Sequence, residues 1–388
     1  MTLRRIVPLA LVLLVSGSSA SSAAQNVWRV DSSGSVPGAF LKVQQAIDAA
    51  SNGDTIVVRG GAYVEEIVID GKGLKIVPEV GQGYWFTVLF PKGCVIRNVP
   101  ADQEVAVRGL GVLNKSFLIL ENNAGPVWIE DCTWQNPNAG IMKPGVRVSN
   151  CEFVSMRLTH AHGSPGSVPF GSLYFFPANG LEVENSTVCL FDCNFFAGMM
   201  GGVPLSFAAK GAVLKSGEIY ADYTSFMVQA GSSVPSFVST QPNSHVEFYN
   251  CTFNGAPNVY AGTSILKSGP NLRWSANSPV YEGQTLNFEA VCETPQIVYA
   301  LISDKSSAQP LFIPGVQGPL ILDLAESFGF QLSTPICSGT VTYTIPAPTV
   351  VPAMQSLPFT AQLLFVAPDF SAVLVGAGCE IVLLDSGA

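Results

Sequence analysis

The chain has 388 residues, of which 12% are charged and 48% are hydrophobic. This composition excludes an intrinsically disordered protein, because disordered chains combine low hydrophobicity with high charge. The formal net charge is −9, and the 19 lysines and arginines form no basic cluster, which excludes a typical nucleic-acid-binding protein. Short runs of β-branched and aromatic residues between glycines and prolines predict an all-β protein.

Residues 1–24 have the pattern of an export signal. Arg4 and Arg5 precede an apolar run at residues 6–15, and small residues at 22–24 resemble a signal peptidase cleavage site. We therefore expect a secreted or extracytoplasmic mature chain that begins at Gln25. No apolar run is long enough to cross a bilayer, so we expect no membrane-spanning segment.

A short helix is predicted over residues 40–50. Phe40, Val43, Ile47 and Ala50 recur at helical spacing and give the helix one apolar stripe. Strands are predicted directly after it, at residues 55–58 and 63–69.

The middle of the chain repeats the pattern apolar-x-apolar-x-(Asp/Asn)-Cys-x-aromatic. Copies lie at residues 127–134, 146–153, 185–195 and 243–253, and a degenerate copy at 216–226 has Thr224 in place of Cys. Their spacing fits solenoid coils of roughly 20–30 residues. We expect equivalent corners of one solenoid at Asp131/Cys132, Asn150/Cys151, Asp192/Cys193 and Asn250/Cys251, with Phe153, Phe195 and Phe253 inside.

The segments 31–34, 43–50, 52–58 and 61–65 resemble the N-terminal cap and first coils of the pectin-lyase-like right-handed β-helix superfamily. The Asp/Asn-Cys-x-Phe copies resemble the coil repeats of that superfamily. The resemblance implies a right-handed parallel β-helix over residues 25–272, whose open end is closed by the short helix.

The repeat stops near Trp274. Strand-like runs at 297–302, 320–324, 340–345, 359–366 and 380–384 alternate with Pro- and Gly-rich turns. We therefore predict a separate C-terminal β-sandwich over residues 273–388, which resembles C-terminal domains of exported bacterial proteins.

Seven of the nine cysteines fall into two groups. Those of the repeat (Cys132, Cys151, Cys193 and Cys251) are expected to be free, buried side chains, and a disulfide is expected among Cys292, Cys337 and Cys379, with the pairing left open. No Cys-x-x-Cys pair exists, which disfavours a zinc site. Cys193 is predicted to point inward and Cys189 outward, so serine is expected to be tolerated less well at 193.

Candidate chemistry is sparse. His160 and His162 lie on one strand face and form either a metal-binding pair or part of a polar loop, and we favour the loop; His245 is expected at the surface. Arginines could neutralise a uronate carboxylate in a polysaccharide lyase, but we expect them to be surface residues; they are Arg97, Arg108, Arg147 and Arg157. The catalytic strings of related hydrolases and esterases are missing, and Ala161-His162-Gly163 is the nearest match to Gly-His-Gly. We assign no catalytic, cofactor-binding or metal-ligating residue.

Two further groups of residues are candidates for binding. Outward glutamates form either a Ca²⁺-binding stripe or, as we favour, a solvated face; they are Glu130, Glu152, Glu182, Glu184, Glu218 and Glu247. Trp85, Trp134 and the aromatic group at residues 174–176 could stack on sugar rings, although Trp134 is expected to be buried.

The sequence thus leaves three functions open. We favour an exported, non-catalytic β-helix protein whose partner is a polysaccharide or a cell-surface glycan. The alternatives are a polysaccharide lyase or hydrolase with a site assembled across coils, and a purely structural spacer. A groove in which Asp, Arg or Lys residues are aligned on one outer sheet and flanked by long loops would favour the enzyme.

Overall fold

The computed structural model describes residues 25–79, 87–89, 93–112, 117–135, 143–165, 177–198, 209–229, 234–242, 244–259, 264–270, 273–303, 306–313, 316–322, 327–332, 336–350, 354–369 and 371–386. The expected export signal, Trp85 and the aromatic group at residues 174–176 lie outside these ranges. No helix among the described residues is long and apolar enough to cross a membrane.

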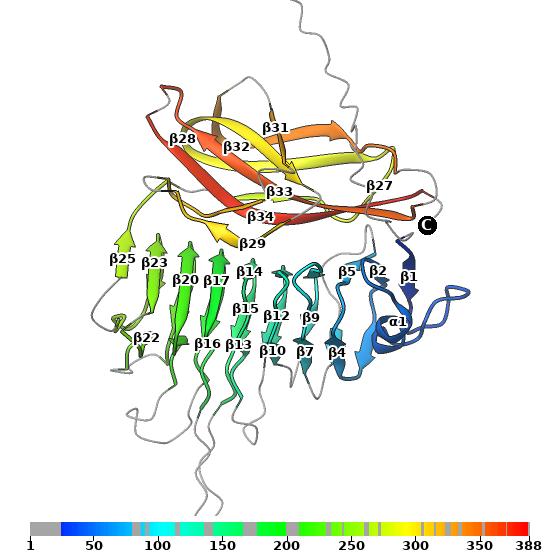
Figure 1. The fold of residues 1–388 in the computed structure, drawn as a ribbon, viewed down its shortest axis with the longest axis horizontal. Coiled ribbons are helices and arrows are strands. Elements are labelled where there is room, and N and C mark those ends of the chain that lie inside the picture. Colours follow the sequence, from blue (N-terminus) through cyan, green and yellow to red (C-terminus); the bar gives the residue numbers. More distant parts are fainter. Residues whose placement is uncertain are drawn as a thin grey trace, which may run out of the picture.

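Three parallel sheets, here named sheets 1 to 3, make up the first part of the chain (Figure 1). In the described ranges, sheet 1 has the strands β1 (Val27–Val30), β2 (Thr55–Val58), β5 (Lys75–Pro78), β8 (Val105–Arg108), β11 (Val127–Glu130), β14 (Val154–Arg157), β17 (Ser186–Phe191), β20 (Gly217–Asp222), β23 (His245–Tyr249) and β25 (Ser264–Lys267). Sheet 2 has β4 (Ile67–Asp70), β7 (Cys94–Arg97), β10 (Leu118–Glu121), β13 (Val146–Ser149), β16 (Leu181–Glu184), β19 (Ala212–Leu214) and β22 (Phe237–Ser239). Sheet 3 has β9 (Gly111–Val112), β12 (Thr133–Gln135), β15 (His160–His162), β18 (Asn194–Phe196), β21 (Ser225–Met227) and β24 (Thr252–Phe253).

From β8 to β23, each coil of this solenoid passes through sheet 1, then sheet 3, then sheet 2, and returns to sheet 1 one strand further along. Alternate side chains of every strand point inward and form one continuous apolar core. Because a single coil cannot bury this face alone, stacking of the coils is what stabilises it. The predicted parallel β-helix is confirmed.

Both sharp corners of the coil use a residue with positive φ. At the corner from sheet 1 to sheet 3, the first corner, these residues include Asp131, Asp192 and Asn250 (φ 52–53°), and at the corner from sheet 2 to sheet 1, the second corner, they are asparagines such as Asn122 and Asn150 (φ 56° and 52°). Asn and Asp tolerate this left-handed conformation better than most side chains. The repeated Asp/Asn therefore marks a turn.

A small residue follows the positive-φ residue and donates a hydrogen bond. At the first corner the hydrogen-bond donors are Cys132, Thr159, Cys193, Thr224 and Cys251, each bonded to the carbonyl oxygen two residues before it at 3.1–3.4 Å. Thiol and hydroxyl groups are interchangeable here because both are donors. Thr159 marks the coil that carries no copy of the cysteine pattern.

The placement predicted for one repeat copy was wrong. Asn150 and Cys151 follow strand β13 of sheet 2 and lie at the second corner, whereas the other three pairs lie at the first. Phe195 and Phe253 belong to the inner core as predicted, but Phe153 packs outside the solenoid against Trp128 (ring centroids 5.6 Å apart). The copies look alike because both corners need a left-handed residue followed by a small one.

The expected order of the two serine exchanges also changes. Cys189 points out of the solenoid, yet it is 0% exposed, in an apolar cluster with Trp128 and Tyr220 beneath the C-terminal strands. A serine at 193 retains the carbonyl acceptors of Phe191 and Met156, whereas the described structure shows no hydrogen bond for the Cys189 thiol. We expect Cys189→Ser to cost about 1–3 kcal/mol and Cys193→Ser less than about 1 kcal/mol. Thermal unfolding midpoints check this; a lower midpoint for Cys193→Ser would contradict it.

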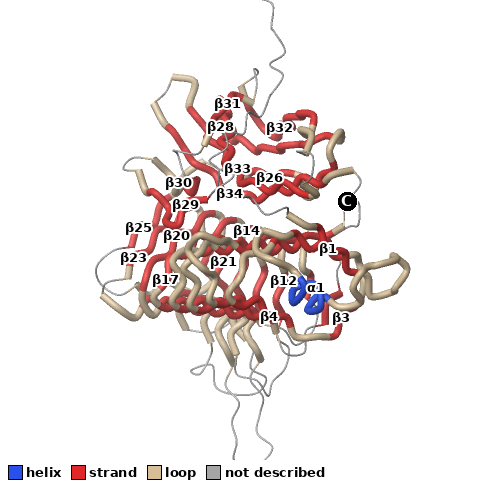
Figure 2. Tube along the Cα trace, turned by 45° about the vertical axis from the view of Figure 1, so that its right-hand side comes forward, coloured by secondary structure: helices blue, strands red, loops and turns tan. Residues whose placement is uncertain are grey.

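The short helix α1 (Val43–Ala49) closes the first coil (Figure 2). Glu65 accepts hydrogen bonds from the first two N–H groups of the helix (2.9 and 3.0 Å), and Lys72 donates to two carbonyl oxygens at its end (3.0 and 2.9 Å). Gln44 pairs through its side chain with the backbone of Val68 on the edge strand β4. The helix thus covers the open end of the core with its buried residues Val43, Ala46 and Ile47.

The C-terminal strands form one curled sheet, because its strand β28 (Thr285–Ser303) is long and bends. The other strands of this part are β26 (Trp274–Ala276), β27 (Val280–Tyr281), β31 (Phe328–Gln331), β32 (Cys337–Pro346), β33 (Ser356–Val366) and β34 (Val373–Leu384). The first half of β28 pairs with β26 and β32 and the second half with β31 and β33, with an irregularity between Cys292 and Gln296. The two halves enclose an apolar core, as in the predicted sandwich.

Two small two-stranded sheets complete the described fold: the pair β3 (Ala62–Val64) and β6 (Thr87–Leu89), and the pair β29 (Ser306–Leu311) and β30 (Leu320–Leu322). A disulfide joins Cys292 to Cys337, which fixes the pairing that the sequence left open. The other seven cysteines are free, as predicted for those of the repeat. Burial raises the pKa of the Cys193 thiol to about 12, so this thiol stays protonated at neutral pH.

Candidate functional site

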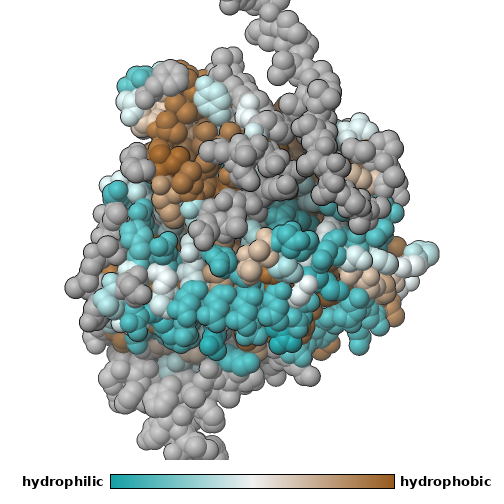
Figure 3. Space-filling view, viewed as in Figure 1, coloured by the Kyte–Doolittle hydropathy of each residue, from teal (hydrophilic) through white to brown (hydrophobic). Residues whose placement is uncertain are grey.

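The outer faces of the three sheets differ in what covers them. The C-terminal sheet lies on the outer face of sheet 1 (Figure 1), with Trp128, Tyr220 and Ile321 in a shared apolar cluster. In the view of Figure 3, a hydrophilic band crosses the coils of the solenoid below this sheet. A binding site on the solenoid must therefore lie on sheet 2 or sheet 3.

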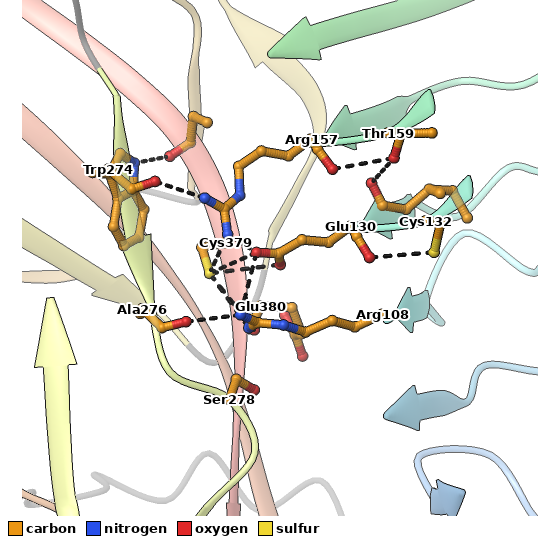
Figure 4. Close-up of polar contacts among 12 residues, drawn as sticks. Arg108, Glu130, Cys132, Arg157, Thr159, Trp274, Ala276, Ser278, Cys379 and Glu380 are labelled. Atoms are coloured by element: carbon orange, nitrogen blue, oxygen red, sulfur yellow. Dashed lines mark hydrogen bonds and ion pairs between the residues drawn. The ribbon is translucent and has the colours of Figure 1, made fainter. Parts of the chain in front are cut away.

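A buried ion cluster fastens the C-terminal strands to sheet 1. Arg108, Glu130 and Arg157 lie side by side on neighbouring strands, and each is at most 6% exposed. The Glu130 carboxylate pairs with both guanidinium groups. Figure 4 shows that the two arginines reach to the segment of β26, where Arg157 donates to the carbonyl oxygen of Trp274 (2.6 Å) and Arg108 to that of Ala276 (2.8 Å). The expectation that Arg108 and Arg157 are surface residues was wrong.

A second buried ion cluster lies further along the same interface. Lys75, which is 2% exposed, pairs with Glu104 and, at 3.0 Å, with Glu380 of β34. The Thr360 hydroxyl donates to the same Glu380 carboxylate (2.9 Å). The charged groups of these two clusters hold the C-terminal sheet in place and are closed to a ligand.

The outer face of sheet 2 is accessible and carries charges of both signs. Arg97 pairs with Asp70 (2.9 Å) and Glu121 (3.8 Å), and Lys215 with two glutamates of β16, Glu182 and Glu184 (3.6 and 3.5 Å). Arg147 is exposed on the same face. The four candidate arginines are thus divided between two faces of the solenoid and do not form one site.

The six glutamates expected to lie together, either as a Ca²⁺-binding stripe or as the favoured solvated face, do not share one face of the solenoid. Glu130, Glu218 and Glu247 belong to sheet 1, Glu182 and Glu184 to sheet 2, and Glu152 to the connection between β13 and β14. The error has the same origin as that for Cys151, since repeat copies that look alike were assigned to one corner. His245, next to Glu247 at 3.2 Å, is half-buried on sheet 1.

The outer face of sheet 3 carries two rows of uncharged polar and apolar side chains. The first row consists of Thr133, His160, Asn194, Ser225 and Thr252, and the second of Gln135, His162, Phe196 and Met227. Apart from the exposed Thr252, these side chains are half-buried. Each of β12, β15, β18 and β21 thus presents one group of each row at the spacing of neighbouring strands, about 4.8 Å, and β24 adds Thr252 to the first row alone.

His160 and His162 share this face, as predicted, but their neighbours are not metal ligands. His160 Nδ1 bonds the Asn194 amide nitrogen at 2.9 Å, and the His162 ring stacks on Phe196 with centroids 4.4 Å apart. Among the described residues, no group of three or more His, Cys, Asp or Glu side chains is placed to hold a metal ion. Burial and the neighbouring His160 lower the pKa of His162, so His162 is neutral at neutral pH.

Sequence reasoning placed Trp134 correctly inside the solenoid, where it is 0% exposed. It missed Asn194 and Phe196 as surface residues. A signal was available, because in the copy Asp192-Cys193-Asn194-Phe195-Phe196 the residues on either side of the inward Phe195 must point outward. In the copies that lie at the first corner, the same positions contribute to the two rows of sheet 3.

Neither a protein-family model nor a curated protein matches the chain. Two solved structures are similar to it. One is a pectin methylesterase in complex with hexasaccharide VII (TM-score 0.39, 9% identity), and the other is pectin methylesterase PemA from Erwinia chrysanthemi (TM-score 0.37, 10% identity). Each similarity covers 66% of this chain and 83% of the other. The similarity to these two structures is one of fold. The assignment of a parallel β-helix to this chain comes from its own strand pairing.

Proposed function

We propose that this is an exported, non-catalytic protein that binds a polysaccharide or a cell-surface glycan through the outer face of sheet 3. The observation that carries the proposal is the double row of hydrogen-bonding and apolar side chains on this face. The C-terminal strands cover the outer face of sheet 1, and the charged side chains on the outer face of sheet 2 pair with one another.

The chemistry of the rows suits an uncharged glycan. Hydroxyl, amide and imidazole groups both donate and accept hydrogen bonds, as sugar hydroxyls do. Phe196 and Met227 add apolar surface for the C–H faces of a sugar ring. The net charge of −9 disfavours polyuronates, which are polyanions. A glycan chain that lies along the solenoid axis would meet equivalent groups on each coil, so weak contacts would add up.

The placement of the acidic groups supports binding without catalysis. Glycoside hydrolysis needs two carboxyl groups on either side of the scissile bond, and the two rows of sheet 3 contain none. Burial raises the pKa of four carboxyl groups among the described residues, and none of them lies in the two rows. Asp131, Asp192 and Asp222 lie at the first corner or at the end of the sheet 1 strand before it, and Glu380 lies in β34.

Co-sedimentation of the mature protein with insoluble uncharged polysaccharides, such as cellulose and chitin, tests the proposal. We expect Phe196→Ala and His162→Ala to weaken binding about tenfold each, which corresponds to about 1.4 kcal/mol. Arg147→Ala, on the exposed face of sheet 2, is the control and should bind like the wild type. Binding is expected to be constant between pH 7 and 8 and to weaken in acidic solution as His162 is protonated, because a bound glycan would desolvate His162 further and so favours its neutral form.

Two outcomes would contradict the proposal. If the wild-type protein binds none of the glycans, a purely structural spacer is favoured. If the protein releases reducing sugars or unsaturated uronates from any glycan, it is instead a hydrolase or a lyase of the superfamily it resembles.

A further inference from the structure

A small pocket lies where the solenoid meets the C-terminal strands. It has room for about one water molecule, roughly 10 Å³. The groups around it include two carboxylates, Asp192 and Asp222, and two guanidinium groups, Arg157 and Arg273. The conformation of the first corner accounts for Asp192, but neither this corner nor the proposed glycan site explains a second, buried carboxylate beside it, that of Asp222.

Asp222 connects the solenoid to the C-terminal strands. It ends strand β20 and is 4% exposed. Its carboxylate accepts hydrogen bonds from the amides of Asn250 on the next coil (3.3 Å) and of Gln317 (3.5 Å). The backbone oxygen of Gln317 accepts a hydrogen bond from the N–H of Val375 in β34 (2.7 Å), so Gln317 is part of the C-terminal fold.

Asp192 and Tyr223 make two further connections around the same pocket. Arg273, just before β26, bonds Asp192 through Nε (2.5 Å) and lies over the Tyr223 ring, 4.9 Å from its centroid. The Tyr223 hydroxyl donates to Glu293 of β28 (3.3 Å). The corner residues of two successive coils are thus tied to the segment that leaves the solenoid and to the C-terminal sheet.

We propose that Asp192, Asp222 and Gln317 form a pH-sensitive joint that holds the C-terminal strands against the last coils more tightly in weakly acidic than in alkaline solution.

The direction follows from the surroundings of Asp222. Burial raises its pKa to about 7, the hydrogen bonds from Asn250 and Gln317 oppose this shift, and the negative charge of Asp192 adds to it. In the unfolded chain the pKa is near 4. Between about pH 4 and pH 7 the Asp222 carboxyl group is therefore protonated in the closed joint and ionised in the unfolded chain. The stability of the joint falls as the pH rises through this window and levels off above it.

The other charged groups near Asp222 come from every element packed around the pocket. Arg157 of β14 and Arg273 keep their charge at all relevant pH values. Tyr249 of β23 is the residue paired with Asp222 on the neighbouring strand. Its hydroxyl oxygen accepts a hydrogen bond from Lys267 of β25 (3.3 Å). Burial also raises the pKa of Asp192, and the ion pair with Arg273 opposes that shift, whereas Asp222 accepts hydrogen bonds from two uncharged amides.

Amide hydrogen exchange of the full mature chain between pH 5.5 and 8.5, corrected for intrinsic exchange rates, tests the joint. In the wild type we expect protection of Trp274–Ala276 and Leu320–Leu322 to fall about tenfold across this range. Asp222→Asn should keep the protection seen at acidic pH throughout, because asparagine resembles the protonated carboxyl group. Asp70→Asn, at an exposed carboxylate of sheet 2, is the control and should behave like the wild type.

A second variant keeps the test decisive if Asp222→Asn fails to fold. Asp192→Asn removes the neighbouring negative charge, so the loss of protection should move to lower pH. A wild-type protein without pH dependence, an Asp222→Asn variant with the wild-type dependence, or an Asp192→Asn variant with an unchanged midpoint would overturn the proposal. The joint does not involve sheet 3, so each of these results leaves the glycan-binding proposal untouched.

Discussion

Replacement of Glu130 by glutamine is expected to lower the free energy of unfolding by about 3–5 kcal/mol. Glu130 is the carboxylate that pairs with both Arg108 and Arg157, and all three side chains are at most 6% exposed. Without it, two guanidinium groups lie close together in a site that water does not reach. Backbone carbonyl oxygens of β26 remain as their partners, and these carry no full charge.

Urea unfolding measures this effect, and two further variants identify its cause. Glu184→Gln removes a half-exposed carboxylate 3.5 Å from Lys215 and should cost less than about 1 kcal/mol. The triple replacement Arg108→Met, Glu130→Leu, Arg157→Met should be close to neutral, because apolar side chains of similar volume often replace a buried ion cluster without loss. A loss below about 1 kcal/mol for Glu130→Gln would show that the cluster is hydrated and does not fasten the interface.

The solenoid could be predicted from the sequence because its signals are local. Inward and outward residues alternate along each strand, a left-handed Asp or Asn marks each corner, and a small donor follows it. The repeat pattern did not predict at which of the two corners each copy lies. In the sheet 1 copies the first inward residue comes two positions after the small one, as Trp134 after Cys132, whereas after Cys151 it is Val154, three positions on. Because of this difference of one residue, the Phe153 side chain points out of the solenoid.

The cover of sheet 1 was missed, although the sequence contains a signal for it. Strands of sheet 1 such as Val127–Glu130 have apolar residues at outward as well as inward positions, whereas Val146–Ser149 of sheet 2 alternates with an exposed arginine. Continuous apolar runs are typical of strands buried on both faces. Which charges the cover would bury, such as Arg108 and Lys75, could not be predicted, because their partners Ala276 and Glu380 are more than 150 residues away in the sequence.

Only part of the candidate site could be predicted, again because its residues come from several coils. The shared face of His160 and His162 follows from the alternation of one strand, but Thr133, Asn194 and Phe196 join them only through the register between coils. That register depends on the coil lengths, which vary along the chain because the connections between sheets 3 and 2 differ in length. Local sequence patterns therefore do not predict the register between coils.

Replacement of Phe226 by alanine is expected to cost about 3–5 kcal/mol, the usual range for a fully buried aromatic side chain. Phe226 is 0% exposed and lies between Phe195 and Phe253 of the neighbouring coils, with ring centroids 6.0 and 5.5 Å away. Phe237 and Phe248 meet it edge to face at 5.5 and 5.7 Å. Because the rings contact it from all sides, the space left by the deletion cannot close without moving several strands.

The effect should be largest in the last coils, because each coil of a solenoid contacts only its neighbours. Hydrogen exchange of Phe237–Ser239 and His245–Tyr249 should therefore increase more in Phe226→Ala than exchange of Thr55–Val58 near the helix cap. Phe312→Ala, at a ring that is 37% exposed, is the matched control and should cost less than about 1 kcal/mol. A uniform increase in exchange along the chain would show instead that the solenoid unfolds as one unit and that the aromatic cluster stabilises all coils equally.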